Sequence, residues 1–139
     1  MSTRPLGTVV LLMLFAAAGA RAQESDTRAA RTAVEGWLAV IDAQHYEASW
    51  EAAAEPFRTA VTLERWTAAA RAAREPLGAV QSRTLASTKA AKTLPGAPDG
   101  EYVVVQFTTR FEHKAEATET VTAVHESDGA WRVVGYFIR

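Results

Sequence analysis

The chain has 139 residues, of which 15 are lysine or arginine and 16 are aspartate or glutamate, and it contains no cysteine. This length predicts a single domain, and the lack of cysteine excludes disulfides, thiol catalysis, cysteine-based zinc sites and acylation at a lipoprotein cysteine. The formal net charge is −1 and the basic residues are dispersed, which argues against the concentrated positive patch that nucleic-acid binding requires.

Residues 1–22 have the pattern of a secretory signal peptide. Arg4 precedes an apolar run from Leu6 to Ala18, and an A-x-A motif ends at Ala22. The run is too short for a hydrocarbon core of about 30 Å, which needs roughly 20 apolar residues. We therefore predict cleavage before Gln23 rather than a membrane anchor. The mature protein is expected to be exported, periplasmic or secreted, with no membrane association after signal cleavage.

Three amphipathic helices are predicted next. Between residues 26 and 43 apolar residues recur at steps of three and four, which is typical of one helix face. A second such pattern covers residues 46–57 and is expected to end or kink at Pro56. A third begins with Thr62 as the N-cap and ends at the sequence EPLG, where proline and glycine break the helix.

The chain then becomes rich in β-branched and aromatic residues. The segments AVQSRTLASTKAAKTL and EYVVVQFTTRF predict two strands joined by the turn LPGAPDG. A third strand is expected from Ala117 to Glu126, and the hairpin signal Asp128-Gly129 leads into a last strand, WRVVGYFIR.

Helices grouped before strands predict an α+β fold, with three N-terminal helices packed on one face of a curved four-stranded antiparallel meander. No strand–helix–strand alternation is present, which argues against a doubly wound nucleotide-binding fold. Residues 23–139 are therefore expected to form a single α+β domain.

The segments GWLAVIDAQHYEASW, RWTAAARAAREPLGAVQSR, LPGAPDGEYVVVQF and WRVVGYFIR resemble a family of small exported bacterial proteins, the domain-of-unknown-function family number 4019. The likeness covers nearly the whole mature chain. It implies a fold and an exported location, and it brings no assigned catalytic residues. The order of elements is also similar to the nuclear-transport-factor-2-like cone, although that fold usually has a strand or hairpin between its helices, and fold does not settle function.

Asp42, His45, Tyr46 and Ser49 lie within eight positions and are the residue types of a hydrolytic triad or proton relay. A working nucleophile needs an oxyanion hole beside it. The N–H groups around a serine in the middle of a helix are already bonded to the preceding turn. We therefore interpret this stretch as a polar corner between two helices and predict no catalytic residue.

The three histidines have no spacing typical of a helical metal site, so we predict neither a metal nor a cofactor. Glu119 and His125 share the strand face expected to turn inward. Apolar surroundings would raise the pKa of an inward carboxylate toward the range of a general base, which ketosteroid isomerase-type members of the cone fold exploit. The simpler interpretation is that Glu119 faces solvent and that His125 is a partly exposed histidine with satisfied hydrogen bonds.

The tryptophans also allow two interpretations. Helix-spaced rings such as Trp50 and Trp66 usually form the core. Alternatively, they line a cleft between helices and sheet that takes a small apolar ligand, together with Glu119 and His125. These four are the candidate ligand-binding residues.

The opposite sheet face is expected to carry much valine, isoleucine and tyrosine: Val104, Thr120, Thr122, Val124, Val134, Tyr136 and Ile138. β-propensity alone enriches such residues on any strand. A contiguous apolar patch nevertheless favours burial against another chain, so we predict a homodimer through this face.

The sequence therefore favours an exported non-catalytic binding or protein-interaction module. The alternative is a small isomerase- or dehydratase-like enzyme that uses Glu119 or His125 in the cleft. Burial separates the two, because an enzyme needs one of those groups inside a cavity with room for substrate. A cleft filled by Trp50, Trp66 and Phe107 would leave protein association.

Overall fold

The computed structural model describes the backbone of residues 9–139 and the side chains of residues 18–139. Its helices are α1 (Val9–Asp42), α2 (Tyr46–Glu51), α3 (Glu55–Ala60) and α4 (Leu63–Arg74), followed by a short 3-10 turn, η1 (Glu75–Leu77). Its strands are β1 (Val80–Ala91), β2 (Tyr102–Phe111), β3 (Lys114–His125) and β4 (Trp131–Ile138). All neighbouring strands pair antiparallel in the order β1-β2-β3-β4.

The α+β class and the antiparallel meander are confirmed, but the described part of the chain has four α-helices before the sheet instead of three. The second predicted helix is divided into α2 and α3. The backbone N–H of Ala54, between them, donates to the carbonyl of Val133 in β4 at 2.8 Å. Pro56 lies in the first turn of α3, where its missing N–H costs no helical hydrogen bond. It therefore starts a helix where we expected one to end.

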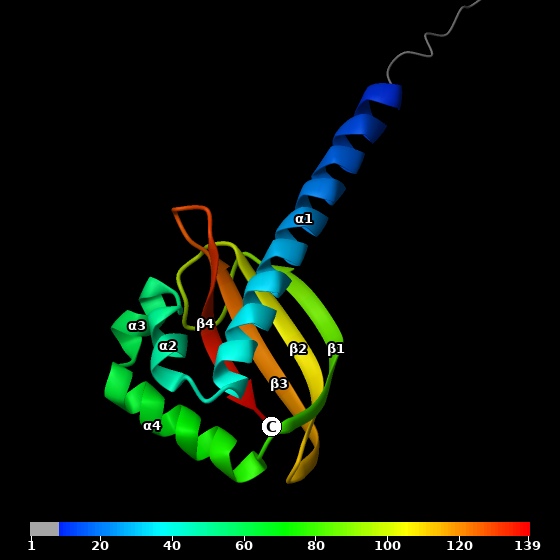
Figure 1. Cartoon of the computed structure of the whole chain (residues 1–139). Coiled ribbons are helices and arrows are strands. Elements are labelled where there is room, and N and C mark those ends of the chain that lie inside the picture. The colour runs from blue at the N-terminus through cyan, green and yellow to red at the C-terminus, as the bar shows by residue number, and fades with distance from the viewer. Residues whose placement is uncertain (1–8) are drawn as a thin grey trace, which may run out of the picture.

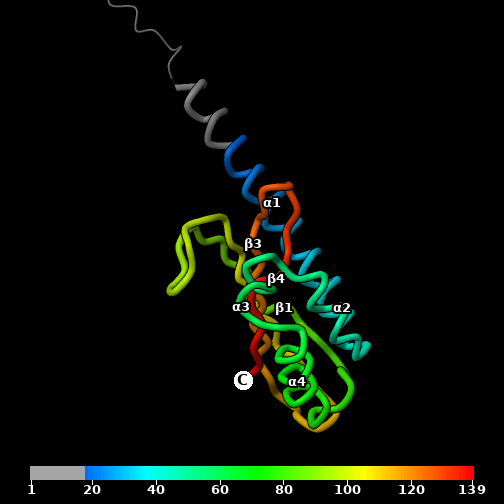
Figure 2. Tube along the Cα trace, turned by 90° about the vertical axis from the view of Figure 1, so that its left-hand side faces the viewer, coloured from blue at the N-terminus to red at the C-terminus, as the bar shows by residue number. Residues whose placement is uncertain are grey.

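The helices and the sheet form two layers (Figure 1). The C-terminal half of α1 crosses the sheet, and α2, α3 and α4 lie beside it on the β4 side. The sheet is open, with β1 and β4 at its two edges. Figure 2 shows the loop between β1 and β2 projecting away from the side that α1 and α2 cover. The sheet thus has one covered face and one outer face.

The core lies between α1 and the inward positions of the strands. α1 buries the face that its sequence predicts: Ala30, Val34, Trp37, Leu38 and Ile41. These residues pack against Val103, Val105, Phe107, Val121, Ala123 and Val133 of the sheet. Aromatic rings fill the space toward α3 and α4, because Trp37 lies 5.9 Å from Trp66 and Trp66 lies 4.9 Å from Phe57, measured between ring centroids.

The N-terminal part of α1 extends away from this core (Figure 1). The predicted signal peptide, residues 1–22, begins outside the described residues, and α1 passes without a break through the predicted cleavage point before Gln23. Among the described side chains, the first buried one is Ala30. Cleavage before Gln23 would therefore leave every buried side chain of residues 18–139 in place. None of the helices within residues 9–139 combines the length and apolarity of a membrane span.

One part of the predicted strand alternation is wrong. The pairing of β3 with β4 is irregular at Val134, which forms a bulge and reverses the face of the residues after it. Tyr136 is consequently paired with Val121, and Ile138 with Glu119, both on the face toward the helices. Tyr136 and Ile138 therefore do not belong to the outer face, where we had placed them.

Candidate functional site

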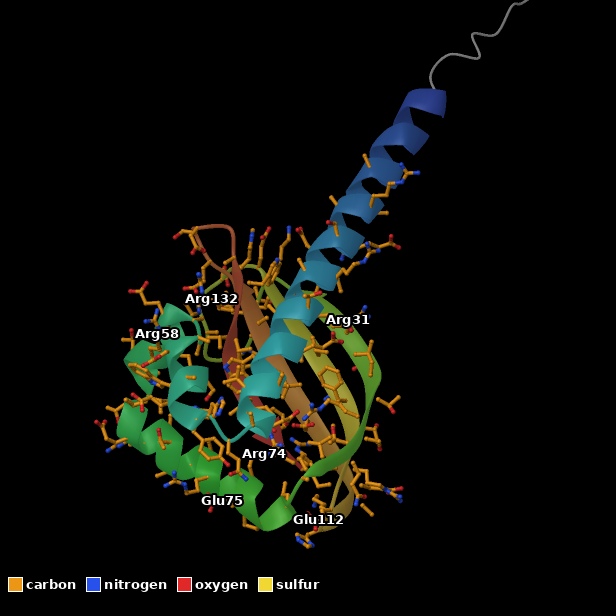
Figure 3. The ribbon with its side chains drawn as sticks, viewed as in Figure 1. Arg31, Arg58, Arg74, Glu75, Glu112 and Arg132 are labelled. Carbon is orange, nitrogen blue, oxygen red and sulfur yellow. The ribbon has the colours of Figure 1, made fainter. Side chains whose placement is uncertain are left out.

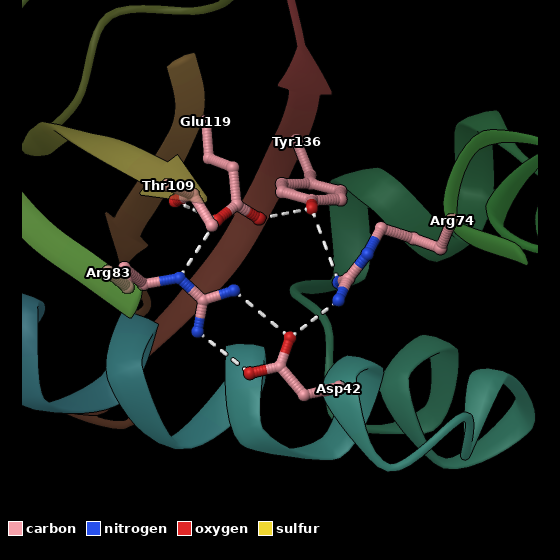
Figure 4. Close-up of polar contacts among 6 residues, drawn as sticks. All are labelled: Asp42, Arg74, Arg83, Thr109, Glu119 and Tyr136. Atoms are coloured by element: carbon pink, nitrogen blue, oxygen red, sulfur yellow. Dashed lines mark hydrogen bonds and ion pairs between the residues drawn. The ribbon is translucent and has the colours of Figure 1, made fainter. Parts of the chain in front are cut away.

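Six polar side chains between the helices and the sheet form one connected network, shown in Figure 4. Each member comes from a different element: Asp42 ends α1, Arg74 ends α4, and Arg83, Thr109, Glu119 and Tyr136 come from β1, β2, β3 and β4 in turn.

Glu119 is completely buried, as is Thr109 beside it. Its Oε1 accepts from Arg83 Nε at 2.8 Å and from the Thr109 hydroxyl at 2.5 Å. Its Oε2 accepts from the hydroxyl of Tyr136. A buried charge is tolerated when it is paired and hydrogen-bonded, so these three donors explain why a carboxylate occupies the interior.

Arg83 lies between two carboxylates. Besides Glu119, its guanidinium binds Asp42 in a bidentate manner, with Nη1 at 2.7 Å from Oδ2 and Nη2 at 3.0 Å from Oδ1. Burial alone would lower the pKa of Arg83, but its hydrogen bonds to Asp42 and Glu119 outweigh that effect and raise it. The side chain is therefore a permanent cation that joins α1 to β3.

Asp42 also accepts from Nη2 of Arg74 at 2.8 Å. Burial would raise the pKa of Asp42, yet the hydrogen bonds from Arg83 and Arg74 outweigh it, so the pKa lies below the ordinary value of 3.8. The result is an ionised carboxylate held between two arginines at the C-terminal end of α1.

Arg74 closes the network from the α4 side. Its side chain is 5% exposed and points into the body of the protein, unlike the peripheral Arg31, Arg58 and Arg132 in Figure 3. Its guanidinium lies 4.9 Å from the ring of Phe111, and Nη1 is 3.4 Å from the Tyr136 hydroxyl. Its Nε has no hydrogen-bond partner among the described residues.

The hydroxyl of Tyr136 links Glu119 to Arg74 and so closes the network. Burial, followed by the negative charge of Glu119, raises the pKa of its hydroxyl well above 10. The hydroxyl thus stays protonated and acts as a donor. With two carboxylates against two guanidinium groups, the network is electrically balanced.

This arrangement is poorly suited to acid–base catalysis. A general base needs a lone pair within hydrogen-bond reach of a substrate proton. Glu119 has no surface on which a substrate can rest, and both of its oxygens already accept hydrogen bonds. The network instead fixes the ends of α1 and α4 to all four strands.

The four candidate ligand-binding residues do not converge on one site. Glu119 and His125 are six residues apart on β3, which corresponds to roughly 20 Å along a strand. The Nε1 of Trp66 donates to the buried Ser49 hydroxyl at 2.9 Å. The Nε1 of Trp50 donates to the Val61 carbonyl at 2.7 Å. Both tryptophans are therefore held by internal hydrogen bonds.

His125 lies at the other end of the sheet, close to the surface. Its Nδ1 is 2.7 Å from Glu101 Oε2, its Nε2 is 3.1 Å from the Gly129 carbonyl, and its ring stacks on Trp131. The hydrogen bond to Glu101 is the main reason that its pKa is raised. These contacts connect the β3–β4 hairpin to the start of β2.

The residues that look like a triad form the predicted polar corner. α1 ends at Asp42 and α2 begins at Tyr46, and between them Gln44 adopts a positive φ of 64°. The Ser49 hydroxyl donates to the Tyr46 carbonyl at 2.6 Å, so this serine binds within its own helix. Asp42 binds Arg74 and Arg83 in the ionic network.

The network partners of Glu119 were not predicted from the sequence. Arg83 lies on β1, which has no buried position, and Arg74 ends a helix whose last turn also contains Arg71. A signal was nevertheless present, since an inward glutamate must have a cationic partner. Within the described residues no group of three or more His, Cys, Asp or Glu side chains is arranged to hold a metal ion.

A groove of about 430 Å³ lies between α4 and β4. It is lined by Trp66, Ala69, Ala70, Ala73 and Leu77 on one side and by Lys114, Tyr136, Phe137, Ile138 and Arg139 on the other. Its surface is mainly apolar, and both of its charged residues are basic.

No curated protein is similar enough to the chain to count as a relative. A family model does match, over residues 33–136, and its description is "Protein of unknown function (DUF4019)". The matched span runs from the buried half of α1 to Tyr136, so it contains all six residues of the ionic network. The match covers most of the domain, and we conclude that the chain belongs to the DUF4019 family.

Proposed function

We propose that this domain is an exported, non-catalytic module that acts by binding another protein. The observation that carries the proposal is that the interior acid, base and donor groups bind one another. Glu119 is enclosed by Arg83, Thr109 and Tyr136, and Asp42 is held by two arginines. A site used for chemistry or ligand capture would keep some of these groups directed at open space.

The isomerase- or dehydratase-like alternative has less support. A carboxylate that is hydrogen-bonded to a guanidinium is held in its charged form and is a weak base. His125, the other candidate, is 32% exposed beside Glu101, and the open surface pocket of about 600 Å³ that it lines does not include Glu119. Carriage of a small apolar ligand in the interior is likewise disfavoured, because the rings of Trp37, Trp66 and Phe57 occupy the space.

A homodimer through the outer sheet face is the second candidate. Phe137 is 48% exposed there, which favours it. The placement of Tyr136 and Ile138 on the opposite face removes two of the apolar residues on which that prediction relied. The side chains of Ser87, Gln106 and Thr120 instead form a hydrogen-bonded polar row across this face: Ser87 to Gln106 and Gln106 to Thr120, each at 3.2 Å. We therefore rank a different partner above a second copy.

Native mass spectrometry tests this proposal, on protein purified from its own producing cells after mild crosslinking in the intact cells. The crosslink retains weak complexes that dilution would dissociate. We expect a complex with another polypeptide, while a second copy alone would favour the homodimer. A retained small molecule, or a monomer without any partner, would overturn the proposal.

A further inference from the structure

The C-terminal half of β4 is an exposed sheet edge beside an apolar groove. Arg139 and Thr118 exchange both backbone hydrogen bonds, at 3.0 Å each. In an antiparallel ladder the bonded pairs alternate with non-bonded ones. Tyr136 and Ile138, opposite Val121 and Glu119, are therefore the non-bonded positions. Their N–H and C=O groups point outward, away from β3.

One outward group of this edge already has a partner within the protein. In the N-terminal half of β4 the Val133 carbonyl accepts from the N–H of Ala54, which lies just before α3, at 2.8 Å. No backbone partner among the described residues bonds the outward groups of Tyr136 and Ile138. The edge is thus contacted by the chain just before the bulge at Val134 and lacks backbone partners among the described residues at Tyr136 and Ile138.

The opposite edge of the sheet is protected against pairing with another chain. Its strand, β1, has two irregularities in its pairing with β2, at Gln81 and Ala86, and carries Lys89 on the outer face. Bulges and lysines on an edge strand hinder pairing with another chain. β4 has a single bulge, and the stretch after it, Gly135 to Ile138, is regular. An incoming strand would therefore find the edge of β4 more accessible than that of β1.

The groove beside this edge has both a shape and a charge that would favour particular side chains of a bound segment. Its walls come from α4 and Leu77, and their alanines leave space for apolar side chains. Lys114 and Arg139 are its only charged residues, and both lie toward the C-terminal end of β4. An antiparallel strand would place its N-terminal residues beside these two cations, so acidic residues there would be favoured.

We propose that the edge of β4 accepts an extended segment of a partner protein, in which acidic residues precede alternating apolar residues. This inference rests on the proposed function and specifies its partner. The segment would pair antiparallel with Tyr136 and Ile138 through its backbone, as strands do when they extend an exposed sheet. Every second side chain would enter the groove against α4, and the acidic residues would face Lys114 and Arg139.

Charge argues for a different partner over a second copy of this chain. β4 of another copy would bring its own Arg139 and Arg132 to the interface, and the stretch from Gly135 to Ile138 contains no acidic residue. Nothing on that strand would complement Lys114 and Arg139. A second copy therefore fits the groove poorly.

The test uses an amidated peptide probe with two glutamates followed by alternating valine and threonine, titrated into the mature protein. Fluorescence anisotropy measures its affinity, and amide hydrogen exchange by NMR locates it. We expect slowed exchange at Tyr136 and Ile138 and at least tenfold weaker binding for a probe with lysines in place of the glutamates. N-methylation of the probe amides that face β4 should abolish binding, and this control leaves the protein unchanged.

Two protein variants complete the test. Ile138→Pro removes an N–H that points away from the sheet, a change that edge strands tolerate, and it should weaken the probe at least tenfold. Thr122→Arg alters only the outer face and should leave the affinity within twofold. Binding that survives both Ile138→Pro and probe N-methylation, or no binding of the acidic probe, overturns the inference. A native complex that persists in Ile138→Pro would overturn it too, but would leave the proposed function standing.

Discussion

Nε of Arg83 lies 2.8 Å from Oε1 of Glu119, and the two side chains reach each other across β2 from β1 and β3. Arg83 is half-buried and Glu119 is completely buried. The edge strand β1 is mostly exposed along its length, so this ion pair and its continuation to Asp42 hold β1 against the core where apolar contacts are few. The pair thus anchors the most exposed strand of the sheet.

Replacement of Glu119 by glutamine should destabilise the fold strongly. The change leaves the buried Arg74 and the half-buried Arg83 with only Asp42 as a counter-charge, and breaking a buried ion pair on one side costs about 3–5 kcal/mol. Thr109→Val keeps the charges and removes one hydrogen bond, so its cost should be nearer 1 kcal/mol. Urea denaturation followed by tryptophan fluorescence measures both. If Glu119→Gln were as stable as the native protein or more so, the carboxylate would be retained for activity at the expense of stability.

Acid should lower the stability of the fold because it protonates Asp42. The folded-state pKa of this carboxyl is lowered by its arginine hydrogen bonds against the opposing effect of burial. Its contribution to stability is therefore fully present above the unfolded-state pKa of about 3.9 and is lost as pH falls through the lower folded-state value. Asp42→Asn should be less stable at neutral pH and should lose less on acidification. Melting temperatures between pH 2 and 6 give the comparison, and parallel curves for the two proteins would refute it.

Ser49 should matter for stability although it is no nucleophile. Its hydroxyl is fully buried and is the acceptor for Trp66 Nε1. Ser49→Ala leaves that indole N–H unpaired in the core, which costs about 1–3 kcal/mol. The exposed Ser82→Ala is the matched control and should change stability by less than about 0.5 kcal/mol. Equal unfolding free energies for the two variants would show that Trp66 finds another acceptor.

The intact mass of the protein from its own cells reports on export. We expect the chain to begin at Gln23, because the A-x-A motif at Ala20 to Ala22 follows a short apolar run. Ala22→Arg, which spoils the motif, should accumulate the longer form. Recovery of the complete chain from a soluble cytoplasmic fraction would contradict this prediction.

Much of the fold could be predicted because its signals are local. The run EYVVVQFTTRF forms β2, whose burial alternates along most of its length, and the Asp128-Gly129 turn separates β3 from β4 as expected. The bulge at Val134 could not be predicted in this way. One extra residue within the run VVGYF leaves the composition of the strand unchanged, and only the pairing with β3 reveals it.

The ionic network was harder to predict from the sequence, for a different reason. Its members are far apart in the sequence: Asp42 and Arg74 are separated by 32 positions, and Arg83 and Glu119 by 36. The inward position of Glu119 follows from alternation along β3. The choice of Arg83 among many dispersed arginines depends on how α1 and β1 meet in three dimensions, which no local pattern encodes.

The bulge at Val134 sets the register of β4 against β3, and the buried Glu119 makes other registers unfavourable. With β4 shifted by one residue, Tyr136 would turn outward and Phe137 would turn inward, so Glu119 would lose its hydroxyl donor and meet an aromatic ring instead. An unsatisfied buried carboxylate is far costlier than a misplaced apolar side chain. The carboxylate of Glu119 therefore raises the free energy of structures in which β4 pairs with β3 in a shifted register, which hydrophobic contacts alone would tolerate.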